Sequence, residues 1–135
     1  MKIVLDTNCL VVALPHKSPY YWLWEAFRNR EIILCYTTDI LFEYDEILSR
    51  FYPAKFVNDV INELLHSKNV KQTNNFFRWH LMNNDPDDHK FVDCALNADA
   101  DYIVTNDRHF NILKTNPFPT SKVVDINSFR QIIGK

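Results

Sequence analysis

Residues 102–107 read YIVTND, a short apolar run followed by polar residues that end in an acid. The chain opens on the same pattern, because residues 2–6 read KIVLD. Continuous apolar runs of this length are typical of strands that are buried on both faces of a parallel sheet. The carboxyl ends of parallel strands share one edge of the sheet, where α/β proteins bind their ligands. We therefore expect Asp6 and Asp107 at the same edge.

Amphipathic segments alternate with these apolar runs. The spacing of apolar residues predicts helices over about residues 19–30, 38–50, 53–65 and 86–98, with a short helix closing the chain. Further strands are predicted at 32–36 and 122–125, and a weaker one at 76–82. Strands that alternate with helices indicate an α/β fold with a central parallel sheet covered on both faces.

Composition limits the function classes. The 135 residues, of which 47% are apolar, suit one domain spanning residues 1–135. The only glycine is Gly134, so no glycine-rich phosphate loop can form. Cys9, Cys35 and Cys94 have no zinc-site spacing and are expected to be buried, reduced thiols. Neither a secretory signal nor a membrane span is expected, which predicts a cytoplasmic protein.

Two more acids are expected at the same edge of the sheet. On a helical wheel, Glu43 lies about 40° from Ile47 and so borders the apolar stripe of its helix. Asp88 is in the first turn of its helix, on the apolar face. Each acid also has an ordinary structural explanation, because such residues cap helices or pair at the surface. Asp45, Glu46 and Asp93 lie off the stripes and are expected to be solvated.

Four carboxylates gathered at one edge would repel one another unless a cation lay between them. Asp6, Glu43, Asp88 and Asp107 come from four different elements of the predicted fold. Oxygen ligands of this kind suit Mg²⁺ or Mn²⁺. An acidic metal site of this type is appropriate for hydrolysis of phosphodiester bonds.

The motifs resemble those of a known family. Residues 3–8 (IVLDTN), 85–91 (DPDDHKF) and 100–107 (ADYIVTND), with a helical glutamate between the first two, resemble PIN-domain ribonucleases over nearly the whole chain. The nearest branch is the VapC-like toxins of bacterial and archaeal toxin–antitoxin systems. The resemblance implies a three-layer α/β/α PIN-like domain and metal-dependent endoribonuclease activity on single-stranded or structured RNA.

The resemblance also implies residue roles. Asp6, Glu43, Asp88 and Asp107 match the catalytic, metal-binding acids of the family, with Asp87 as the alternative to Asp88. Asn8 and Thr105 match the polar residues that position the substrate and the last acid. The competing hypothesis is a PIN-like module that binds RNA or protein without cutting.

The expected partners are RNA, an antitoxin protein and a second copy of the chain. Tyr21 and Trp22 lie off the apolar stripe of their helix and are expected to be exposed, so we expect this helix to form a homodimer or antitoxin interface. Lys90, Arg108 and His109 are next to the site acids and are either phosphate contacts or ordinary surface charges.

Overall fold

The computed structural model describes residues 1–74, 89–107, 110 and 122–135. The strands are β1 (Lys2–Leu5), β2 (Ile33–Tyr36), β3 (Val70–Gln72), β4 (Tyr102–Val104) and β5 (Lys122–Val124). The helices are α1 (Thr7–Ala13), α2 (Tyr21–Arg28), α3 (Thr38–Phe51), α4 (Ala54–His66), α5 (His89–Ala98) and α6 (Ile126–Ile132).

The strands form one parallel sheet in the order β3-β2-β1-β4-β5. The central strand β1 is paired on both sides, with Val4 opposite Cys35 of β2 and Ile103 of β4. Its side chains Ile3, Val4 and Leu5 are buried, as expected for a continuous apolar run in a parallel sheet.

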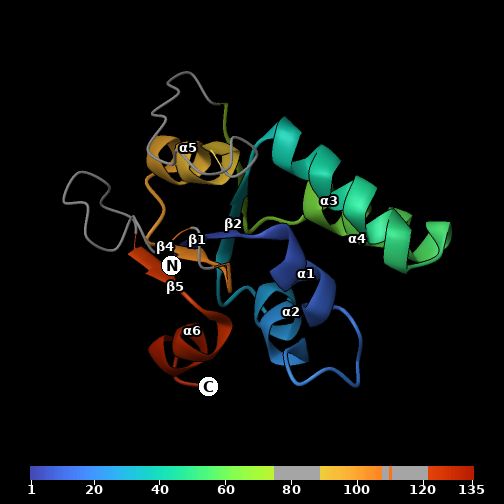
Figure 1. Cartoon of the computed structure of the whole chain (residues 1–135), viewed down its shortest axis with the longest axis horizontal. Helices are drawn as coiled ribbons and strands as arrows, with labels where there is room; N and C mark the ends of the chain where they lie inside the picture. Colours follow the sequence, from blue (N-terminus) through green and yellow to red (C-terminus); the bar gives the residue numbers. More distant parts are fainter. Residues whose placement is uncertain (75–88, 108–109, 111–121) are drawn as a thin grey trace.

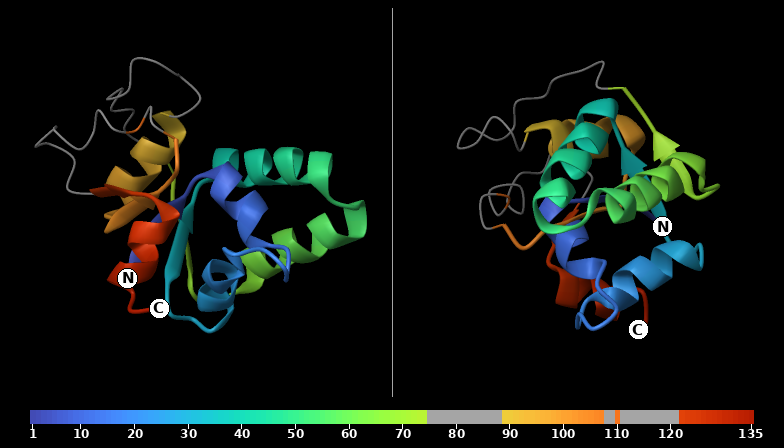
Figure 2. Two further views of the ribbon diagram at one scale, coloured as in Figure 1. Left: turned by 60° about the horizontal axis from the view of Figure 1, so that its bottom comes forward. Right: turned by 90° about the vertical axis from the view of Figure 1, so that its right-hand side faces the viewer.

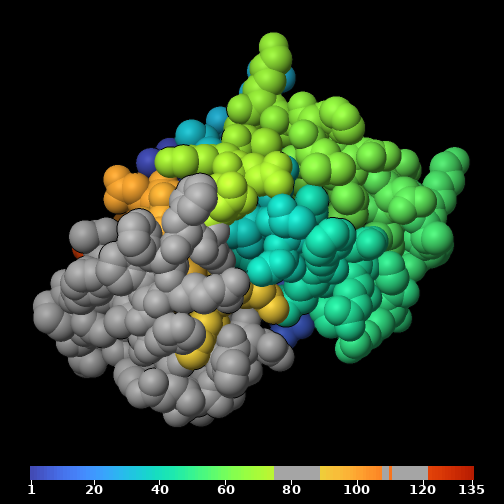
Figure 3. All heavy atoms as spheres, turned by 90° about the horizontal axis from the view of Figure 1, so that it is seen from above, coloured from blue at the N-terminus to red at the C-terminus, as the bar shows by residue number. Residues whose placement is uncertain are grey.

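Helices cover both faces of the sheet, which gives the three-layer α/β/α architecture of a PIN fold (Figure 1). Helix α5 lies on one face, while α1, α2 and α6 lie on the other (Figure 1). Helices α3 and α4 form a pair that extends beyond the sheet to one side (Figure 2). On the face seen in Figure 3, their side chains (teal and green) pack against one another. The predicted fold class is confirmed.

Three tyrosines attach the α3–α4 pair to the rest of the molecule. The hydroxyl of Tyr44 donates to the carbonyl of Leu5 at the end of β1. The hydroxyl of Tyr52 donates to the carbonyl of Val11 in α1 over 2.6 Å. On the other side, the hydroxyl of Tyr36 in β2 donates to the carbonyl of Leu64 in α4 over 2.8 Å. The first two bonds fix α3 over the corner between β1 and α1, and the third holds α4 against β2.

The structure corrects two expectations about exposure. Trp22 is only 9% exposed, because it packs towards α6 with its ring 6.4 Å from that of Phe129. Tyr21 is half-buried and stacks on His16 at 4.6 Å. Asp93, expected to be solvated, is only 3% exposed. The helical wheel predicted the wrong exposure for these residues because α2 and α5 each pack against more than one neighbouring element.

Other expectations stand or lie outside the described residues. The three cysteines are free and buried, and Asp45 and Glu46 are exposed. Strand β3 was not predicted, because its short sequence VKQ carries one apolar residue. The predicted strand at 76–82 falls outside the described residues. Within the described ranges, no helix is long and apolar enough to cross a membrane.

Candidate active site

The register of β1 and β4 brings the first two site residues together. Leu5 pairs with Val104, so the residues that follow them, Asp6 and Thr105, leave the sheet side by side. The peptide N–H of Asp6 donates to the carbonyl of Val104 over 3.0 Å. The Thr105 hydroxyl donates to Asp6 Oδ2 over 2.8 Å and accepts from the N–H of Asp107 over 3.0 Å. Thr105 therefore links the two predicted acids.

Asp6 is a buried carboxyl in an unfavourable electrostatic environment. Its residue is 7% exposed, and burial is the largest of the effects that raise its pKa above the usual value. The hydroxyl of Thr105 and the backbone of Thr7 oppose this shift, while the charges of Asp107 and Glu43 add to it. The Asp6 backbone occupies the N-cap position of α1, but its side chain makes no capping bond there. Helix capping therefore does not explain this acid.

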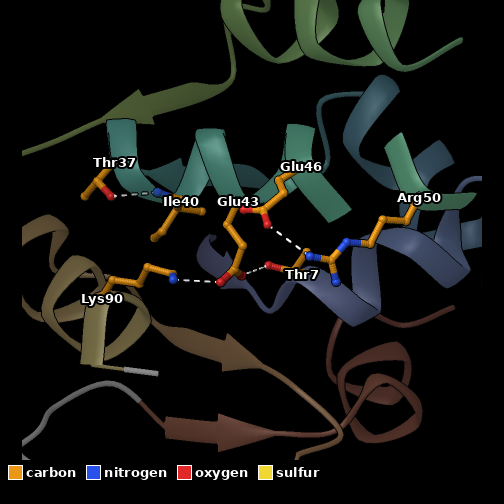
Figure 4. A network of polar contacts seen from close by, with 7 residues as sticks. All are labelled: Thr7, Thr37, Ile40, Glu43, Glu46, Arg50 and Lys90. Carbon is orange, nitrogen blue, oxygen red and sulfur yellow. Dashed lines mark hydrogen bonds and ion pairs between the residues drawn. The ribbon is translucent and has the colours of Figure 1, made fainter. Parts of the chain in front are cut away.

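Glu43 approaches the same corner from α3. Its neighbour Tyr44 is the residue that anchors this helix to the end of β1. The Thr7 hydroxyl, at the start of α1, donates to Glu43 Oε2. Lys90 of α5 places its Nζ 2.7 Å from Glu43 Oε1. Figure 4 shows Glu43 between these two partners, so both of its carboxylate oxygens are engaged.

A pocket of about 300 Å³ opens beside these acids. Asp6 and Asp107 line it together with the predicted positioning residue Asn8, which is exposed. The other described residues that line it are Cys9, Val12, Tyr20 and Asn106. The carboxyl edge of the sheet thus presents oxygen-bearing side chains from two strand ends to one hollow, as the matching positions of Asp6 and Asp107 predicted.

The described acids lie close enough to interact, but they do not form a complete ligand set. Asp107 and Glu43 both raise the pKa of Asp6. Among the residues the structure describes, no three His, Cys, Asp or Glu side chains are grouped to hold a metal ion. The predicted third acid, Asp88, and its alternative Asp87 lie outside the described residues.

The residues present nevertheless fit a divalent cation. In the part of the chain that is described, no Lys, Arg or His side chain pairs with Asp6. A cation bound beside a buried carboxylate that is repelled by two others would offset this electrostatic repulsion. The available donors are oxygens, which suit Mg²⁺ or Mn²⁺.

Sequence reasoning missed the roles of three residues of this site, including Lys90, which was expected to be a phosphate contact or an ordinary surface charge and instead pairs with Glu43. Thr7 and Lys90 hold Glu43, and Tyr44 positions its helix. Thr7 follows Asp6 directly and Lys90 follows Asp88 closely, so their proximity to the acids was visible. Their pairing with Glu43 was not visible, since it joins segments 36 residues apart in the case of Thr7. Arg108 and His109 lie outside the described residues.

The fold and the acidic edge define a class: α/β/α domains with carboxylates gathered at the carboxyl ends of a parallel sheet. The chain belongs to the PIN domain family, since the model of that family matches residues 2–109. Proteins of this family are nucleases. The family predicted from the sequence motifs is therefore confirmed.

A solved structure supports the fold. A chain of the crystal structure of VapBC2 from Rickettsia felis bound to a DNA fragment from their promoter matches with a TM-score of 0.63. The sequences are 15% identical, and the alignment covers 93% of this chain and 98% of that chain. At this identity the likeness shows the fold alone. Among curated proteins, none matches the chain.

Proposed function

We propose that this protein, as a single domain over residues 1–135, is a metal-dependent endoribonuclease that hydrolyses phosphodiester bonds of single-stranded or structured RNA. One observation carries the proposal: Asp6 and Asp107 line a common pocket while Glu43 lies close enough to raise the pKa of Asp6. Carboxylates that repel one another in this way would be stabilised by a divalent cation bound from solution.

Asp6, Glu43 and Asp107 would hold Mg²⁺ or Mn²⁺, and Asp88 is the fourth proposed ligand. A bound ion would lower the pKa of a water molecule and neutralise charge on the attacked phosphate. Thr105 orients Asp6 and the backbone of Asp107 through its two hydrogen bonds. Asn8 faces the pocket at an exposed position, where its amide can contact the substrate.

The biological role that we propose is the toxin of a toxin–antitoxin pair in the cytoplasm. Support comes from the sequence motifs, the family and the fold shared with a chain of the VapBC2 structure. An antitoxin protein and a second copy of the chain are the proposed partners. The α3–α4 pair is a better candidate surface for them than α2, because Phe42 and Phe51 of α3 are 67% and 64% exposed.

A cleavage assay tests the proposed activity. Purified protein is incubated with single-stranded and structured RNA in Mn²⁺ or Mg²⁺, and then in EDTA. We expect cleavage that EDTA abolishes and that Asp6→Asn and Glu43→Gln each reduce by about 100-fold or more. Asp45→Asn is the matched control, because Asp45 is an exposed acid on the same helix as Glu43. Activity that survives both site substitutions would overturn the proposal.

The competing function is an inactive PIN-like module that binds RNA or protein. One observation favours it: Glu43 is already paired with Lys90. Metal binding alone does not separate the two functions, since an inactive site can retain its ion. RNA that is bound but not cut, with Mn²⁺ and with Mg²⁺, would support the binding module.

A further inference from the structure

The pair between Lys90 and Glu43 differs from the other ion pair on α3. Lys90 Nζ lies 2.7 Å from Glu43 Oε1, and the two side chains are only 21% and 24% exposed. On the same helix, Arg50 and Glu46 pair at 3.0 Å with side chains that are 63% and 67% exposed. The attraction between charges is stronger where water is partly excluded, so the first pair is the more strongly coupled.

Lys90 is a largely shielded cation. It lies on α5, and its side chain is only 21% exposed. Its Nζ also lies 5.7 Å from the centre of the Phe91 ring, which keeps the side chain close to the core. A lysine held close to the core needs a compensating anion, and Glu43 supplies it.

The contacts of Glu43 leave no oxygen without a partner. Oε1 faces the ammonium of Lys90, and Oε2 accepts from the hydroxyl of Thr7 (Figure 4). A divalent ion on this carboxylate would lie close to the ammonium and would be repelled by it. The ion and Lys90 therefore compete for Glu43.

We propose that Lys90 is a built-in counter-cation on Glu43, which a divalent ion must displace before the site is loaded. Lys90 is then a positioning residue: it holds Glu43 in the metal-free protein and lowers the affinity of the site for metal. The inference rests on the proposed nuclease site, because it takes Glu43 to be a metal ligand.

Titration calorimetry of the metal-free protein with Mn²⁺ tests this competition without any activity measurement. Lys90→Met removes the charge and keeps a long apolar side chain. We expect it to bind Mn²⁺ about threefold more tightly or better. Lys90→Arg keeps the charge and should bind Mn²⁺ as the wild type does. Arg50→Met, which removes a cation from the exposed pair on α3, is the matched control and should leave the affinity unchanged.

A double-mutant cycle separates direct competition from general charge effects. In a Glu43→Gln background, Lys90→Met should no longer tighten Mn²⁺ binding, because the shared carboxylate is gone. An equal gain in that background, or a gain with Arg50→Met, would overturn the proposal. So would a Lys90→Met variant that binds Mn²⁺ no better than the wild type.

The same titrations distinguish this inference from the proposed function. If Asp6→Asn weakens Mn²⁺ binding while Lys90→Met changes nothing, the metal site stands and the role of Lys90 is wrong. If neither the wild type nor Lys90→Met binds Mn²⁺, both proposals fail.

Discussion

Replacing the buried acid of the site should stabilise the metal-free protein. Burial and the charges of Asp107 and Glu43 raise the pKa of Asp6, and two hydrogen-bonding groups only partly oppose them. Each unit by which folding raises a carboxyl pKa costs about 1.4 kcal/mol of stability when the group is charged. Asparagine removes the charge and can still accept from Thr105. We expect Asp6→Asn to raise the free energy of unfolding in EDTA, by about 1.4 kcal/mol for each unit by which folding raises the pKa of Asp6.

The pH dependence has a defined sign. Because its pKa is raised in the folded state, Asp6 binds its proton more tightly there than in the unfolded chain. The metal-free wild type therefore loses stability as the pH rises from the ordinary value of 3.8 through the raised pKa. The advantage of Asp6→Asn should be greatest above the raised pKa and should disappear below the ordinary one.

Urea unfolding in EDTA, repeated across pH, measures this effect. Asp45→Asn is the control, since that exposed acid should change stability little. Adding Mn²⁺ at about 100 times its Kd should stabilise the wild type by about 2.7 kcal/mol and the Asp6→Asn variant by less. A variant that is less stable than the wild type in EDTA at neutral pH would refute the reasoning, because the hydrogen bonds of Asp6 would then outweigh its burial.

Three further substitutions or reagents test the scaffold of the site. Thr105→Val should cost about 1–3 kcal/mol by urea unfolding, because the buried oxygen of Asp6 loses its donor; Thr105→Ser should retain most of the stability. Tyr44→Phe should lower the free energy of unfolding by about 1–2 kcal/mol in the same assay, because the carbonyl of Leu5 loses the hydroxyl that donates to it. An unchanged free energy of unfolding would contradict the role of Tyr44 in anchoring α3. Burial raises the pKa of Cys9 to about 12 and that of Cys35 to about 11. Both thiols should therefore resist a disulfide reagent at pH 8 until denaturant is added, and rapid labelling of the native protein would contradict their burial.

The fold class and the edge that carries the site could be predicted from the sequence. The strands at 2–5 and 102–104 are buried on both faces of the sheet. Their sequences are therefore continuous apolar runs, which can be recognised without knowledge of the tertiary structure. The acids that follow them could then be assigned to one edge, because parallel strands end on the same side. In the structure, Asp6 and Asp107 line one pocket, as this assignment predicted.

Exposure was harder to predict where an element has several neighbours. Trp22 and Asp93 lie off the apolar stripes of their helices and are nevertheless buried. A helical wheel assumes one packed face, while Trp22 of α2 also packs towards α6, which lies beside α2 on the same side of the sheet. Strand β3 was not predicted, because an edge strand of three residues contains too few side chains to show a pattern of apolar residues.

The sequence by itself determined which residue types could hold a cation and where along the chain they stand. Only the tertiary structure decided how those residues are held: Thr105 lies 99 positions from the carboxylate it orients, and Thr7 lies 36 positions from Glu43. The spacing of apolar residues in the local sequence reflects which positions of an element are buried. Contacts between residues 36 or 99 positions apart depend instead on strand register and on the docking of α3. Strand register and helix docking are set by the packing of the whole core, which no single segment specifies.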